Sequence, residues 1–234
     1  MYGVAGMAAF EKTMAYAKSK GMIVMADVKR NDIGATAACY ANAYVGKTPM
    51  PYGEEQAFSS DIATINPYLG VDGIKPFTEA CAANGTGVFA LVKTSNPSSG
   101  QLQDLKYEDG RTLYEAVADL VEEWGAETRG ETGYSVIGAV VGATYPGQLA
   151  EMREKAPHTF FLVPGYGAQG GGAEGVAKAF DDKGLGAIVN SSRGIIAAYQ
   201  QEKYASFGAE NFAEASRAAV EDMRADIAGA LANR

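Results

Sequence analysis

Residues 22–32 read MIVMADVKRND, an apolar run that ends in a cluster of charged side chains. Residues 22–27 are nearly continuous in apolar character, which is typical of a strand buried on both faces of a parallel sheet. Lys29 and Asp32 follow this run directly. In parallel α/β barrels the reacting groups lie at the carboxyl ends of strands and in the loops that follow. The stretch therefore predicts both a barrel strand and a candidate site at its end.

The same pattern recurs along the chain, where apolar runs alternate with helical stretches. The predicted strands are 22–27, 61–66, 87–93, 134–142, 159–163 and 185–190. The predicted helices are 8–20, 78–83, 111–127, 147–155, 175–183 and 211–232. Such alternation indicates a parallel sheet with right-handed crossovers. Six strands are found where a closed barrel has eight. The deficit fits either an open doubly wound sheet or a barrel that lacks its first two strands, and the chain opens on a helical stretch with no strand before it. We expect the second, an α/β fold with a TIM (β/α)8 barrel incomplete at its N-terminus, as a single domain over residues 1–234.

Two connecting segments are longer than a simple loop. Residues 41–59 are interrupted by Gly46, Pro49 and Pro51, so we interpret them as an inserted loop or a broken helix. Residues 94–109 follow a strand and are rich in Ser, Gly, Asn and Gln. That composition fits either a mobile active-site loop or a plain surface loop.

Charge and composition limit the classes of partner. The formal net charge is −8 at pH 7, whereas a nucleic-acid-binding surface is basic, so we expect no nucleic-acid partner. No run reaches membrane-spanning length and no signal peptide is visible, which favours a cytoplasmic protein without membrane contact. Cys39 and Cys81 lack metal-ligand spacing, and His158 has no matching ligand partner, so we expect no metal site.

Two consecutive predicted strands near the C-terminus end in residues suited to phosphate binding. The first is followed by PGYGAQGG (residues 164–171) and the second by SSRG (residues 191–194). Small residues let backbone N–H groups approach an anion, and a helix N-terminus adds its dipole. Arg193 can add a two-pronged contact. The last two strands of a barrel commonly bind phosphate, so these segments predict a phosphate site; two tight turns and a surface arginine are the alternative.

The charged cluster has the spacing of an acid–base site. Asp27 and Lys29 are two residues apart, so on a strand their side chains point to the same side, and Arg30 should point away. Asp32 lies just beyond, in the following loop. A lysine flanked by carboxylates is expected to stay protonated. It is then suited to donate a proton and to stabilise a developing carbanion. The alternative is a solvated charge cluster at a strand end.

Five motifs together resemble the orotidine 5′-phosphate decarboxylases, in the longer bacterial branch of that family. They are DVKRNDIGAT (27–36), NPYLG (66–70), TSNP (94–97), PGYGAQGG (164–171) and NSSRG (190–194). The resemblance covers essentially the whole chain. It implies decarboxylation of orotidine 5′-monophosphate to uridine 5′-monophosphate in de novo pyrimidine biosynthesis. It also implies a homodimer with shared active sites and no metal or organic cofactor.

The resemblance also implies a role for each site residue. Lys29 protonates C6 of the pyrimidine as carbon dioxide leaves, and Asp27 lies beside the departing carboxylate. Asp32 reaches into the neighbouring subunit's site, together with two residues that follow it. Ser95 hydrogen-bonds the pyrimidine ring, and residues near the C-terminus hold the phosphate. The substrate-binding residues implied are Ile33, Thr36, Ser95, Pro164, Gln169, Gly170 and Arg193.

The sequence departs from the family pattern at its start. Family members have a first strand that ends in an aspartate and a second that ends in a lysine, and neither has a counterpart here. We therefore expect a truncated chain. Two other functions stay open. One is a metal-dependent phosphosugar decarboxylase or epimerase of the same barrel superfamily, which would share the Asp-x-Lys-x-x-Asp spacing. The other is a non-catalytic remnant that binds a nucleotide phosphate.

Overall fold

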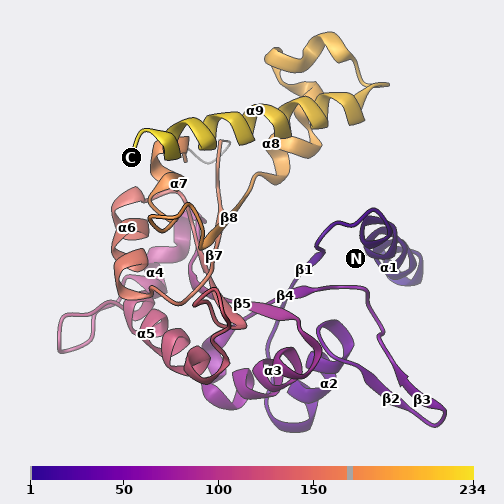
Figure 1. The fold of residues 1–234 in the computed structure, drawn as a ribbon, viewed down its shortest axis with the longest axis vertical. Coiled ribbons are helices and arrows are strands. Elements are labelled where there is room, and N and C mark those ends of the chain that lie inside the picture. Colours follow the sequence, from indigo (N-terminus) through magenta and orange to yellow (C-terminus); the bar gives the residue numbers. More distant parts are fainter. Residues whose placement is uncertain (1, 168–170) are drawn as a thin grey trace. The chain divides into compact units, whose positions relative to one another are not determined.

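A computed structural model describes residues 2–167 and 171–234 of the chain (Figure 1). These residues form two compact units. The first comprises Met1–Val92 and Asp119–Ala139, and the second comprises Lys93–Ala118 and Val140–Arg234. No helix in the described part of the chain is long and apolar enough to cross a membrane.

The first unit contains the N-terminal strands of the parallel sheet. Strand β1 pairs with β4, and β4 pairs with β5. Helices α2 and α3 pack against each other, and the antiparallel strands β2 and β3 follow α2. The bounds are α1 Gly3–Ser19, β1 Met25–Arg30, α2 Gly34–Tyr44, β2 Thr48–Met50, β3 Gly53–Glu55, β4 Ile62–Ile65, η1 Pro67–Leu69, α3 Val71–Asn84, β5 Gly87–Lys93 and η3 Ala126–Thr128.

The second unit contains the C-terminal strands. Strands β7 and β8 are parallel neighbours, and the long helix α9 packs against α7, α8, η4 and η5 (Figure 1). Its elements are η2 Pro97–Ser99, α4 Gly100–Gln103, α6 Pro146–Lys155, β7 Phe161–Pro164, α7 Ala173–Ala177, β8 Ala187–Asn190, α8 Ser192–Ile196, η4 Ala198–Gln200, η5 Glu202–Phe207 and α9 Phe212–Ala232. Helix α5 (Leu113–Gly125) and strand β6 (Ile137–Val141) contribute residues to both units, and the last residue of β5, Lys93, belongs to the second unit.

The predicted alternation of strands and helices is confirmed. The long strands pair in the order β1-β4-β5-β6-β7-β8, so each predicted strand is present. Every residue of β6 is buried and β5 is nearly so, as expected for strands of a parallel sheet, which are buried on both faces. The bounds of β5 are those predicted. Strand β1 is displaced, since it begins at Met25 and runs on to Arg30, so Lys29 lies on the strand.

Some helical predictions were wrong: helix α2 was not predicted, and the bounds of α1, α3 and α7 differ from the predicted ones. Residues 34–44 form α2, whose buried residues Ala37, Ala41 and Tyr44 lie on one face. The insertion predicted over residues 41–59 therefore begins only after this helix, and it includes the β2–β3 pair. Helix α3 begins at Val71 and not at residue 78, since Ile74 and Phe77 pack into the core despite the glycine and proline near them.

Helix α7 ends at Ala177, six residues before the predicted end. The chain turns instead at Asp181, whose carboxylate accepts hydrogen bonds from the backbone N–H groups of Lys183 and Leu185. Such a side chain offers the backbone an alternative to helical hydrogen bonding.

Candidate active site

The carboxyl end of β1 carries an ion pair between Lys29 and Asp27. The Lys29 ammonium donates a hydrogen bond to Asp27 Oδ1. The hydroxyl of Thr64, on the neighbouring strand β4, donates to the same oxygen at 2.8 Å and accepts from the Lys29 backbone N–H at 2.9 Å. Thr64 is buried, whereas both members of the ion pair are solvent-accessible. The ion pair is therefore held in place by the buried Thr64 on one side and is accessible to a ligand on its solvent-exposed side.

The contact between Asp27 and Lys29 was predicted, but simple strand alternation does not produce it. Lys29 has a φ of +47°, the one positive value among the described residues other than glycine. The register of β1 against β4 also shifts between Ala26 and Arg30. A left-handed residue in a strand re-aims the side chains around it, as bulges beside active sites do. Such strain at a charged side chain is characteristic of functional sites.

Arg30 turns away from the ion pair, as predicted. Its guanidinium lies over the ring of Tyr40 on α2, 5.6 Å from the ring centroid, and its Nε donates to the carbonyl of Val28. Lys29 is therefore the cation that the strand presents beside Asp27.

Asp32 does not complete a three-membered cluster. Its carboxylate accepts a hydrogen bond from the backbone N–H of Ile33 at 2.8 Å, and within residues 2–167 and 171–234 no ion pair joins it to Lys29. Ile33 is 52% exposed, and Thr36 is exposed in the first turn of α2. Among the described residues, Asp27 is thus the one carboxylate that pairs with Lys29 within this chain, and the role of Asp32 stays a prediction. These three residues lie on the surface that follows β1.

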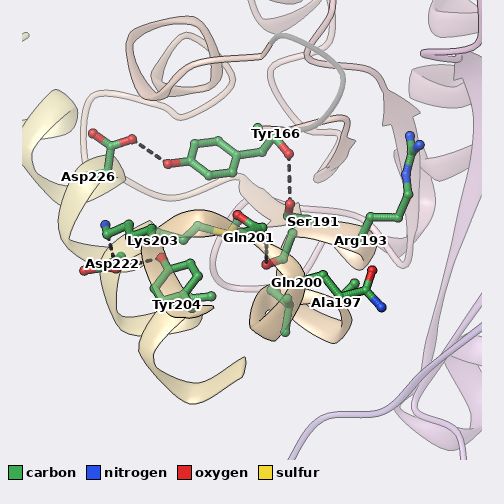
Figure 2. Close-up of a pocket in the computed structure, with 15 residues that line it drawn as sticks. Tyr166, Ser191, Arg193, Ala197, Gln200, Gln201, Lys203, Tyr204, Asp222 and Asp226 are labelled. Carbon is green, nitrogen blue, oxygen red and sulfur yellow. Dashed lines mark hydrogen bonds and ion pairs between the residues drawn. The ribbon is translucent and has the colours of Figure 1, made fainter. Parts of the chain in front are cut away.

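In the second unit, the segments after β7 and β8 are joined directly. The buried Ser191 donates its hydroxyl to the carbonyl oxygen of Tyr166 at 2.9 Å (Figure 2). Tyr166 in turn donates its phenol to Asp226 on α9 at 2.5 Å. Burial, followed by the hydrogen bond to Asp226, raises the pKa of the Tyr166 phenol well above its usual range. The two segments predicted to bind phosphate are therefore brought together.

These segments border a cavity of about 790 Å³ that includes Arg193 among its lining residues. Arg193 is exposed, and Figure 2 shows its side chain extending away from Lys203 and Asp222, which pair with each other at 2.7 Å. Pro164 is half-buried as the last residue of β7. The predicted phosphate ligands Gln169 and Gly170 lie outside the described residues.

Ser95 lies two residues beyond the end of β5 and is half-buried. The residue at the strand end, Lys93, is buried and pairs with Asp104. Sequence reasoning assigned no role to Thr64 or to Lys93. For Lys93 a signal existed, because a lysine that ends a buried apolar strand needs a partner for its charge. Within the described residues, no group of three or more His, Cys, Asp or Glu side chains is arranged to hold a metal ion.

Residues 2–206 match the family described as "Orotidine 5'-phosphate decarboxylase / HUMPS family". The chain belongs to this family. It is 46% identical over 228 residues to an orotidine 5′-phosphate decarboxylase of Rhodopirellula baltica, covering 97% of this chain and 74% of that protein. It is 47% identical to the enzyme of the same name from Caldicellulosiruptor bescii, covering 94% of this chain and 73% of that protein.

A solved structure shows the same family likeness. The chain superposes on the Leishmania donovani OMP decarboxylase with a TM-score of 0.71 at 32% identity, covering 97% of this chain and 76% of that one. The expected α/β barrel class is thereby confirmed, with the six strands of the pairing order above. The chain spans about three quarters of the length of the curated family members named here.

Proposed function

We propose that this chain catalyses the loss of carbon dioxide from orotidine 5′-monophosphate to give uridine 5′-monophosphate, with Lys29 as the proton donor. The observation that carries the proposal is the Lys29 ammonium held against Asp27 at the carboxyl end of β1. Family membership supplies the substrate class. The arrangement of Thr64 below this pair supports the assignment, because it leaves the cation facing outward.

The chemistry requires a localised positive charge. When the C6–carboxylate bond breaks, the electron pair stays on C6 as a vinyl-type carbanion, which the ring cannot delocalise well. A preorganised cation beside that carbon stabilises the charge as it develops. A proton then passes from Lys29 Nζ to C6, leaving a neutral amine that is reprotonated from solvent. In this scheme Asp27, which accepts the hydrogen bond from Lys29, fixes the direction of the ammonium and faces the departing carboxylate.

The second unit is proposed to bind the phosphate. The hydrogen bond from Ser191 to the Tyr166 carbonyl holds the turn that carries Arg193 beside the glycine-rich segment. Arg193 makes no ion pair with another described residue, so its guanidinium is available for a two-pronged contact with an anion. Binding energy from a remote phosphate can organise the reacting end of a substrate. We assign Pro164, Gln169 and Gly170 to the same role.

We further propose that the active form is a homodimer with shared sites. Asp32, Ile33 and Thr36 lie next to the Lys29 end of β1, and Ile33 presents a large apolar side chain to solvent. The match of DVKRNDIGAT (27–36) to the family motif supports this proposal, and the exposed Ile33 leaves that surface open to a second chain. In a dimer these residues would reach the site of the second subunit, and Asp32 would supply there the second carboxylate that Lys29 lacks in one chain.

The test is an absorbance assay of orotidine 5′-monophosphate consumption by the purified chain, with and without Lys29→Ala. We expect turnover by the unmodified chain. In the variant we expect kcat to fall by about 10²–10⁴-fold, the usual contribution of a positioned general acid. Lys75→Ala, which removes an exposed lysine on α3, is the matched control and should leave kcat unchanged. Equal rates for Lys29→Ala and the unmodified chain would contradict the assignment.

Two further measurements separate the alternatives. Calorimetric titration with uridine 5′-monophosphate that shows binding, while the assay shows no turnover, would favour the non-catalytic remnant. Loss of turnover on adding a chelator, with recovery on adding a divalent metal, would favour the metal-dependent phosphosugar enzyme. Turnover that a chelator leaves unchanged agrees with the proposal.

A further inference from the structure

Lys93, the last residue of β5, carries a buried cation that the proposed reaction does not use. Its side chain is 2% exposed, and its Nζ lies 2.5 Å from Asp104 Oδ1. The rings of Tyr114 and Tyr145 face the same ammonium, with their centroids 5.3 and 5.6 Å from Nζ. A buried ammonium persists only where its partners offset the lost hydration, and a carboxylate with two aromatic faces does this.

A second connection lies directly beside this ion pair. The backbone N–H of Thr94 donates to Oε1 of Gln103 at 2.9 Å, and Nε2 of Gln103 donates back to the Thr94 hydroxyl at 2.8 Å. Residues 93 and 94 are thus tied to residues 104 and 103. These contacts, made by four side chains and one backbone N–H group, hold together the two ends of the segment between residues 94 and 103, which forms η2 and α4.

Ser95 lies at this base and is confined from the other side by Gly142, which follows β6. The backbone N–H of Gly142 donates to the carbonyl of Lys93 at 2.8 Å. A Cβ atom at Gly142 would lie 3.0 Å from both the backbone nitrogen and the Cβ of Ser95. Glycine at this position therefore lets the two backbone segments lie close together, whereas a side chain here would press against Ser95.

We propose that Lys93, Asp104 and Gln103 form a clasp that positions Ser95 for the pyrimidine ring. They are positioning residues and do not touch the substrate. A hydrogen bond to a ligand contributes most to affinity when the protein group is already held in position. Breaking the contacts of the clasp should therefore weaken the hydrogen bond from Ser95 to the nucleotide. The inference rests on the proposed function, since it takes the ligand of Ser95 to be the ring of a pyrimidine nucleotide.

The principal test is Asp104→Asn, measured as the Kd for uridine 5′-monophosphate and as KM and kcat for orotidine 5′-monophosphate. Asp104 is 43% exposed, so the change removes the charge partner of Lys93 at an accessible position. We expect Kd and KM to rise about tenfold, the scale of one charge-assisted hydrogen bond, with a smaller change in kcat. Gln103→Leu, which leaves the ion pair intact, should shift Kd in the same direction.

A double-mutant comparison distinguishes positioning of Ser95 from general destabilisation. In a Ser95→Ala background, Asp104→Asn should change Kd less than about twofold, because the group through which the clasp acts is already absent. Asp109→Asn is the matched control: it removes a carboxylate paired with Arg111 at 2.8 Å in the same connection, outside the clasp, and should leave Kd unchanged. An equal loss of affinity in both backgrounds would overturn the inference, as would no loss in either.

The rate of trypsin cleavage after the exposed Lys106 reports whether the clasp is intact, and this measurement needs no ligand. Asp104→Asn and Gln103→Leu should accelerate this cleavage relative to Asp109→Asn, because the segment before Lys106 is released. If the unmodified chain neither turns over substrate nor binds uridine 5′-monophosphate, the proposed function fails, and the pyrimidine-binding role of Ser95 fails with it. If cleavage is unchanged in both clasp variants, the clasp itself is wrong, whatever the activity.

Discussion

At the scale of single residues, the hydroxyl of Thr64 decides how Asp27 and Lys29 are held. It is the one group that contacts both the carboxylate of Asp27 and the backbone of Lys29 among the described residues. Thr64→Val keeps the buried volume and removes both hydrogen bonds. Bonds to charged groups contribute roughly 1.5–3 kcal/mol, so we expect kcat to fall about tenfold to a hundredfold. Steady-state kinetics with orotidine 5′-monophosphate measures this.

Thr64→Ser is the control, because it retains the hydroxyl and removes only a methyl group. It should keep kcat within about threefold of that of the unmodified chain. The missing buried methyl group should lower only the free energy of unfolding, by a small amount. Equal losses of kcat in the valine and serine variants would show that packing, and not the hydrogen bonds, governs the pair. Thr64 also shows a limit of sequence reasoning: it looks like any threonine in an apolar strand, and its role comes from the pairing of β4 with β1, 37 residues away.

At the scale of elements, the start of α5 is fixed by a reciprocal pair of hydrogen bonds. The Glu115 carboxylate accepts from the backbone N–H of Thr112 at 2.8 Å, and the Thr112 hydroxyl accepts from the backbone N–H of Glu115 at 3.4 Å. This is the capping box of the pattern Thr-x-x-Glu. Glu115 also accepts from the ammonium of Lys155 on α6, so one carboxylate both caps a helix and joins it to its neighbour.

Glu115→Gln should therefore lower the free energy of unfolding at neutral pH. The hydrogen bond from Lys155, followed by that from the Thr112 backbone, lowers the pKa of Glu115 from 4.5 to about 2. A lowered pKa in the folded state gives stability that is present above pH 4.5 and is lost as the pH falls towards 2. Because Lys155 is 39% exposed, we expect only about 1–2 kcal/mol. Urea unfolding at pH 7 and at pH 2.5 measures the difference.

The matched control is Glu221→Gln on α9, which breaks an exposed pair with Arg217. It should change the free energy of unfolding by less than about 0.5 kcal/mol, as exposed pairs four residues apart on a helix do. If Glu115→Gln lowered stability equally at both pH values, the ionised carboxylate would not be responsible.

The elements also show what the sequence could predict. Strand β5 was predicted with its observed bounds because Gly87 and Lys93 flank a continuous apolar run. The start of α3 was missed because Gly73 and Pro76 lower helix propensity there, while burial of Ile74 outweighs it. Gly73 is required by packing, since a Cβ at that position would lie 2.9 Å from the carbonyl oxygen of Asp32. The local sequence pattern predicts buried strands well. It fails to predict the bounds of an element where tertiary contacts outweigh local propensity.

At the scale of the whole molecule, the chemical groups are divided between the two units and, in the proposed dimer, between two chains. The motif residues could be named from the sequence because they follow strands, where barrel enzymes place reacting groups. The partners of Lys93 could not, because Asp104 and Tyr145 approach it from two separate connections. Asp32 could be placed near the strand end, yet its proposed role in a second subunit's site depends on an assembly that the sequence does not encode locally.

Complementation between two inactive variants tests the shared site. Lys29→Ala subunits retain Asp32, and Asp32→Ala subunits retain Lys29, so a mixed dimer has one site with both groups and one with neither. Random pairing makes half of the dimers mixed, and each has one intact site of two, so roughly a quarter of the unmodified activity should return in a two-fold symmetric dimer. Coexpression of the two variants, followed by the absorbance assay, measures the recovery. Each variant expressed alone gives the baseline, and light scattering confirms the dimer. Activity of the coexpressed sample that stays at this baseline, in a sample shown to be dimeric, would place Asp32 and Lys29 in the same chain's site.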